Sequence, residues 1–137
     1  GVKGLPVGLG EPYFDSVESL ISHAVFSIPG VRGVEFGDGF AASSMRGSEH
    51  NDPFGPEGRL MKNGAGGVNG GLTNGNELLF RVAFKPTSTI SRPQTTWDFS
   101  RRRLVELSAG GRHDVCFALR TPVVVEAMTA VVLCNLI

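Results

Sequence analysis

The sequence predicts a single domain spanning residues 1–137 that contains both helices and strands, because helix patterns and strand patterns both occur along it. A length of 137 residues is enough for one hydrophobic core and too short for two ordinary domains. Apolar residues recur with the helical period in one stretch, a second stretch is apolar on nearly all sides, and three others are typical of strands. The expected helices are 14–28 and 123–136, and the expected strands are 31–36, 78–84 and 101–107.

The composition excludes several classes of function. Hydrophobic residues make up 41% of the chain, and 13 basic residues balance 13 acidic ones, which argues against a general nucleic-acid or membrane-surface binder. Cys116 and Cys134 form no disulfide framework, so we expect a reducing, cytoplasmic compartment. The most apolar window, 123–137, is shorter than the ~18 residues of a membrane span. The histidines and cysteines are scattered, and no pair has the spacing of metal ligands.

The first helix is expected over Phe14–Ile28. Its apolar residues fall on one face, and Pro29 stops it. Asp15 and Glu18 have the spacing of a capping box, with Asp in place of Ser or Thr. His23 lies opposite the apolar stripe and is interpreted as a solvated surface residue.

A short strand over Val31–Phe36 and a Gly-Asp-Gly turn follow, and Phe40–Met45 is expected to continue the sheet. The polar stretch 46–62 is rich in turn formers, which is typical of a lid, a binding loop or a disordered tip.

A stretch rich in glycine and asparagine, Asn63–Gly75, leads into the alternating strand Leu78–Phe84 and then into Lys85-Pro86-Thr87-Ser88-Thr89. Glycine lets several N–H groups turn toward one anion, and Lys, Ser and Thr add further donors. This series favours a site for a phosphate-bearing ligand. A long flexible hairpin connection is the alternative. The glycine stretch lacks the dinucleotide-binding fingerprint and is not a Walker loop.

The C-terminal part contains one further candidate site. Residues 90–100 are expected to be extended or looped, and a strand is expected over Arg101–Leu107. On the glycine-rich turn after it, Arg112 and Asp114 offer a cation and a proton acceptor on one surface; an exposed ion pair worth under ~1 kcal/mol is the alternative. Thr121 is expected to cap a buried helix that begins at Pro122.

Six motifs occur in the order found in chorismate synthases, and the chain resembles that family over essentially its whole length. They are Gly8–Pro12, Ser27–Gly37, Ala65–Gly71, Lys85–Ile90, Gly110–Asp114 and Pro122–Met128.

The resemblance implies a fold and an activity. The fold is α+β, with antiparallel sheets and packed helices, as part of the family's β-α-β sandwich. The activity is a 1,4-anti elimination of phosphate from 5-enolpyruvylshikimate 3-phosphate to give chorismate. Reduced FMN is required as cofactor, and the family enzyme is a cytoplasmic homotetramer with no nucleic-acid or membrane partner.

Site residues are also implied by the resemblance. Asp114 is expected to assist proton removal beside the flavin. The residues expected to contact FMN are Pro29, Gly30, Gly70, Lys85, Pro86, Thr87, Ser88, Thr89 and Arg112.

Two departures from the family pattern qualify these expectations. Val115 stands where many members have proline. Family members are also well over twice as long, and this chain resembles their C-terminal portion, so none of His23, His50 and His113 matches the two histidines proposed as general acids. We therefore expect a fragment that is inactive alone. A non-catalytic structural or assembly module that no longer binds flavin is the alternative.

Overall fold

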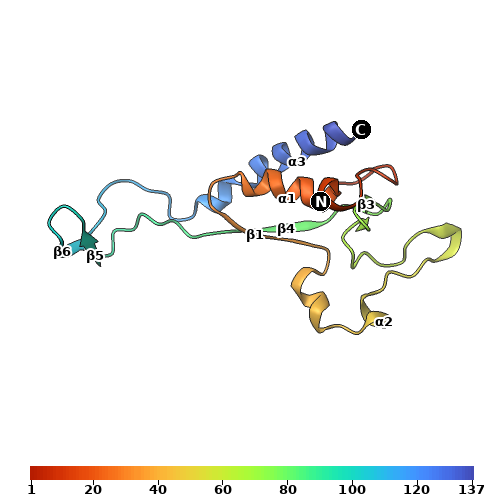
Figure 1. Ribbon diagram of the computed structural model, residues 1–137, viewed down its shortest axis with the longest axis horizontal. Coiled ribbons are helices and arrows are strands. Elements are labelled where there is room, and N and C mark those ends of the chain that lie inside the picture. The colour runs from red at the N-terminus through yellow and green to blue at the C-terminus, as the bar shows by residue number, and fades with distance from the viewer.

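The computed structural model describes residues 1–137 and places two helices side by side against a two-stranded sheet (Figure 1). The helices are α1 (Val17–Phe26) and α3 (Pro122–Leu136). The strands are β1 (Val31–Phe36) and β4 (Phe80–Phe84), which pair antiparallel. This arrangement confirms the α+β class with antiparallel sheets and packed helices.

Helix α1 is shorter than expected at both ends. Ser16, not Asp15, is its N-cap residue, and the Ser16 Oγ accepts a hydrogen bond from the Ser19 N–H at 3.1 Å. The prediction of a cap at Asp15 is wrong because residues 13–15 form a separate 3₁₀ turn, η1 (Tyr13–Asp15). The helix buries Val17, Ile21 and Val25 completely, so the 3.6-residue pattern did identify the core face.

The pairing of β1 with β4 separates an apolar face from a charged one. Phe36 lies opposite Phe80, with ring centroids 5.5 Å apart, on the face that packs against the core. On the other face, Arg81 Nε lies 2.9 Å from Glu35 Oε1. The alternation predicted for residues 78–84 is therefore confirmed, with Leu78 fully buried ahead of the strand.

Residues 39–62 do not continue the sheet, so the prediction for Phe40–Met45 is wrong. The segment forms the 3₁₀ helix η2 (Gly39–Ser44), the short helix α2 (Gly47–His50) and the turn η3 (Pro56–Gly58). The glycine-rich stretch then forms a small hairpin of β2 (Val68–Asn69) and β3 (Leu72–Thr73).

A second hairpin stands away from the helices, at the end of the molecule opposite the chain termini (Figure 1). It consists of β5 (Gln94–Asp98) and β6 (Arg103–Leu107). Strand β5 lies in a region expected to be only extended or looped. Strand β6 begins two residues later than expected, because Arg101 and Arg102 belong to the connecting turn, where Arg102 has a φ of 48°.

Helix α3 begins at Pro122 as expected, but the prediction that it is buried is wrong. Only Thr129 and Leu133 are buried, and Val123 and Val131 are more than half exposed. Thr121 precedes the helix without capping it, because its Oγ1 donates to the Ala118 carbonyl at 2.8 Å. None of the helices combines the length and apolar character needed to cross a bilayer.

Candidate functional site

Three segments that are distant in sequence meet where β4 ends. The Lys85 N–H donates to the Gly30 carbonyl at 2.8 Å, and the Thr87 Oγ1 donates to the Asp114 carbonyl at 2.9 Å. We call the set of Pro29–Gly30, Lys85–Thr89 and Arg112–Asp114 the junction. It contains every predicted site residue except Gly70.

Gly30 lies close to the ring of Phe117. Its φ of 96° lies in the left-handed region, and a Cβ there would be 2.7 Å from the Phe117 Cζ. Phe117 in turn packs edge-on against Phe84, with ring centroids 6.2 Å apart. Phe117 opens the 3₁₀ helix η4 (Phe117–Arg120). The left-handed backbone and the closeness of Phe117 therefore both favour glycine at position 30, independently of any ligand.

The Asp114 carboxylate pairs with Arg120, not with Arg112. Arg120 Nη1 lies 3.1 Å from Asp114 Oδ2, and the two side chains are 78% and 45% exposed. Arg112 forms no ion pair and no side-chain hydrogen bond within the chain. The Arg120 pairing could not be predicted from the sequence, because Arg120 lies beyond the glycine-rich turn in a stretch without a recognisable motif.

The junction presents several donors that the chain itself does not use. Lys85 and Arg112 have no carboxylate partner, and the hydroxyls of Ser88 and Thr89 make no hydrogen bond. The N–H groups of residues 87–89 also lack backbone acceptors. Two cations, two hydroxyls and a run of amides match the acceptor-rich, negatively charged phosphate of FMN, so this donor set fits that group.

Gly70 lies away from the junction. It is in the turn of the β2–β3 hairpin, whose Gly67 packs so closely on the backbone that a Cβ would be 2.8 Å from the Leu78 Cα. Leu78 precedes β4, whereas Lys85 follows it. The strand therefore separates Gly70 from the Lys85 segment. A Cβ on Gly70 would meet no atom within 4 Å, so its surroundings are open.

The start of the glycine-rich stretch already holds an anion from the chain. The N–H groups of Gly64 and Ala65 donate to the two carboxylate oxygens of Asp52 at 2.7 and 2.9 Å. Gly64 itself is buried, and so are Gly66 and Gly67. This stretch is therefore a packed hairpin braced by an internal carboxylate, which differs both from an open anion cradle and from a flexible connection.

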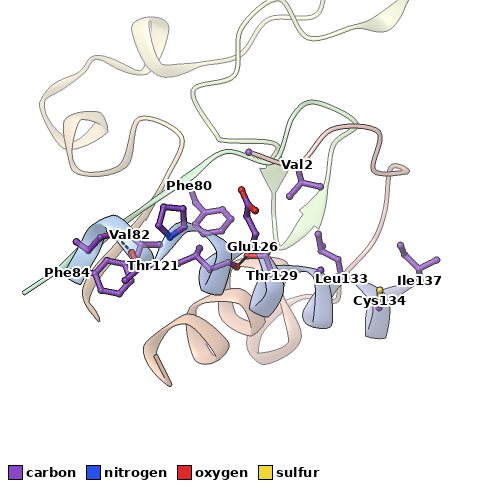
Figure 2. Close-up of a pocket in the computed structure, with 15 residues that line it drawn as sticks. Val2, Phe80, Val82, Phe84, Thr121, Glu126, Thr129, Leu133, Cys134 and Ile137 are labelled. Carbon is purple, nitrogen blue, oxygen red and sulfur yellow. Dashed lines mark hydrogen bonds between the residues drawn. The ribbon is translucent and has the colours of Figure 1, made fainter. Parts of the chain in front are cut away.

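An apolar groove of 680 Å³ lies beside the junction, between β4 and α3. Figure 2 shows Phe80, Val82 and Phe84 on one side and Val2, Thr129 and Leu133 among the other lining residues, with Glu126 reaching into it. Its lining is mostly hydrophobic, so it supplies few donors for a phosphate. No group of three or more His, Cys, Asp or Glu side chains is placed to hold a metal ion.

Comparison with known proteins gives a consistent result. A family described as chorismate synthase matches residues 1–137. A chorismate synthase of Chitinophaga pinensis is 56% identical over 135 residues, which are 98% of this chain and 41% of that protein. A chorismate synthase of Korarchaeum cryptofilum is 54% identical, over 92% of this chain and 36% of that protein.

The fold comparison agrees. A crystal structure of a chorismate synthase superimposes with a TM-score of 0.75 at 31% identity, covering 98% of this chain and 34% of that chain. The 137 residues thus span about two fifths or less of the length of these relatives.

Proposed function

Because the chain belongs to the chorismate synthase family, we propose that it forms the FMN-side portion of an enzyme converting 5-enolpyruvylshikimate 3-phosphate to chorismate and phosphate. The reaction is a 1,4-anti elimination, in which a C–H bond and a C–O bond to phosphate break and a second ring double bond forms. Reduced FMN, when bound, supplies electron density as the phosphate leaves.

The observation that carries this proposal is the junction. Its three segments are joined by the Lys85–Gly30 and Thr87–Asp114 hydrogen bonds, and its cations have no partner in the chain. Unpaired Lys85 and Arg112 are suited to the FMN phosphate, and the Ser88 and Thr89 hydroxyls to its phosphate or polar flavin edge. We assign proton acceptance to the Asp114 carboxylate, since a positioned carboxylate can act as a general base.

We further propose that these residues form one domain that is inactive alone and that contributes to a cytoplasmic homotetramer. His23 and His50 lie outside the junction, and the His113 ring lies 3.3 Å from the Gly110 carbonyl of its own turn. The chain is proposed to be inactive alone because none of these three histidines matches the two that are proposed as general acids in the family. Gly70, on the far side of β4, is proposed to reach a flavin site only in a larger assembly.

The test is a titration of the purified chain with oxidised FMN, followed by flavin absorbance and fluorescence, with and without 5-enolpyruvylshikimate 3-phosphate. We expect saturable binding that Lys85→Ala and Arg112→Ala each weaken about tenfold, the effect of losing one charge-assisted contact. Lys3→Ala and Arg59→Ala are the matched controls, because these exposed residues form no ion pair and lie outside the junction.

A second candidate function is a non-catalytic assembly module. The apolar groove and the exposed valines of α3 favour it, because such surfaces mark contacts with other protein. Absence of FMN binding at high flavin concentration, in a chain shown by circular dichroism to be folded, would contradict the flavin assignment and support this candidate.

A further inference from the structure

We propose that Arg120 is the positioning residue that orients the Asp114 carboxylate, an inference that rests on the proposed role of Asp114 as proton acceptor. Neither composition nor motif spacing marks Arg120. The assignment comes from the contact between its guanidinium and the carboxylate.

Asp114 is held at two points. Its backbone carbonyl accepts from the Thr87 Oγ1 at 2.9 Å, which ties it to the segment after β4. Its Oδ2 lies 3.1 Å from the Arg120 Nη1, which ties it to η4. Its Oδ1 accepts no hydrogen bond within the chain. Arginine has donors and no acceptor, so this contact directs one oxygen toward Arg120 and leaves the other available to take a proton.

Arg120 is attached to a better fixed element than Asp114. Residues 108–116 are irregular and belong to no helix or strand. In contrast, η4 is anchored at its start by Phe117 against Phe84 and Gly30. At its end, the Thr121 N–H and Oγ1 both donate to the Ala118 carbonyl, at 3.2 and 2.8 Å. The ion pair therefore links the Asp114 side chain, which lies on irregular backbone, to the fixed position of η4.

Because the Arg120–Asp114 ion pair is exposed, a substitution of Arg120 can change the orientation of Asp114 without unfolding the chain. With side chains 78% and 45% exposed, an ion pair of this kind contributes little to stability, so Arg120 variants are expected to fold. Catalysis is more sensitive, because a base displaced by about 1 Å can lose about 100-fold in rate. Arg112 does not share this role, because it forms no ion pair with Asp114 and remains free for a ligand.

The kinetic test places these 137 residues in a full-length enzyme. They replace the 135 matching residues of the Chitinophaga pinensis chorismate synthase, which is 56% identical over that stretch. In this chimera Arg120→Gln is expected to lower kcat about 10- to 100-fold with little change in KM. Arg120→Lys is expected to recover part of the loss. Arg59→Gln, at an exposed arginine outside the junction, is the control.

A second readout distinguishes positioning from a general structural role. With substrate deuterated at the carbon that loses its proton, Arg120→Gln is expected to raise the isotope effect on kcat, since a misplaced base makes proton removal slower relative to other steps. An active chimera in which Arg120→Gln changes neither kcat nor the isotope effect overturns the inference.

An inactive chimera would count against the proposed function and would not test the role of Arg120. A structural measurement on the full 137-residue chain tests that role without activity. In the ¹³C,¹⁵N-labelled chain, scalar couplings are expected to show one χ1 rotamer for Asp114, and Arg120→Gln is expected to average it. Averaged couplings in the parent chain, or unchanged couplings in the variant, overturn the positioning role whatever the activity.

Discussion

Gly37 and Gly70 have nearly the same left-handed backbone, with φ values of 54° and 60°, but very different neighbours. A Cβ on Gly37 would lie against the backbone of the glycine-rich stretch, 2.5 Å from the Gly66 nitrogen and 2.8 Å from the Ala65 carbonyl carbon. A Cβ on Gly70 would meet nothing within 4 Å. Substitutions at the two positions therefore distinguish the free-energy cost of a left-handed backbone from the cost of a steric clash.

The prediction at this scale compares Gly37→Ala with Gly70→Ala in the absence of FMN. Gly70→Ala is expected to lower the free energy of unfolding by about 1 kcal/mol, the cost of a left-handed non-glycine residue. Gly37→Ala is expected to lower it by a further 1–3 kcal/mol or so, because backbone atoms cannot move aside as a side chain can. Urea unfolding of both variants measures the difference. Equal losses would show that the loop relaxes around the new methyl group.

At the scale of elements, the start of the glycine-rich stretch is hydrogen-bonded to a carboxylate from the polar segment before it. Asp52 accepts from both Gly64 and Ala65, and Asp38 lies 3.3 Å from the His50 ring nitrogen and 3.8 Å from the Lys62 Nζ. These contacts fold the segment back onto the hairpin. Turn-forming residues alone do not reveal such long-range pairing. The sequence therefore did not distinguish between a lid, a binding loop and a disordered tip for residues 46–62.

Asp52→Asn tests this brace. The substitution keeps the shape of the side chain but replaces one acceptor oxygen with an NH₂ group, so one of the two amides loses its partner. We expect a loss of about 1–2 kcal/mol in the free energy of unfolding and faster hydrogen exchange at Gly64 or Ala65. Glu57→Gln is the control, because Glu57 is an exposed carboxylate of the same segment without a hydrogen bond or ion pair. Similar effects of the two substitutions would contradict the role of Asp52.

The contrast between α1, β4 and β5 follows how much of each element the core covers. Helix α1 and strand β4 bury one face, so their apolar residues repeat with periods of 3.6 and 2 and were identified from the sequence. Strand β5 leaves all its residues exposed except Asp98, which is half-buried, so its sequence carries no burial pattern and it was missed.

Within the candidate site, the same limit applies to Arg120, whose partner is set by the path of the backbone and not by spacing. Gly30 was expected from family resemblance, but its contact with Phe117 emerges only in three dimensions.

At the scale of the whole molecule, the main departure from expectation is the exposure of α3. Its sequence is apolar on nearly all sides, which predicts burial, yet α1 packs against only one side of it and an open groove lies between α3 and β4 (Figure 1). Val131 is 59% exposed, whereas Val25 of α1 is fully buried. These two valines have the same side chain and the same helical backbone. The difference in their exposure therefore shows how much of each helix is covered by the rest of the chain.

The same substitution at these two positions is therefore expected to have opposite consequences. Val25→Ala removes two buried methyl groups and leaves a cavity beside Ile21, so we expect it to lower the free energy of unfolding by about 2 kcal/mol. Val131→Ala removes methyl groups that already contact water and introduces a residue of higher helix propensity, so we expect a change within about 0.5 kcal/mol, in the stabilising direction. Urea unfolding at two protein concentrations measures both. A loss at Val131 that grows with protein concentration would show that a second copy covers α3 in solution, and that the outer face of this helix is an interface between chains.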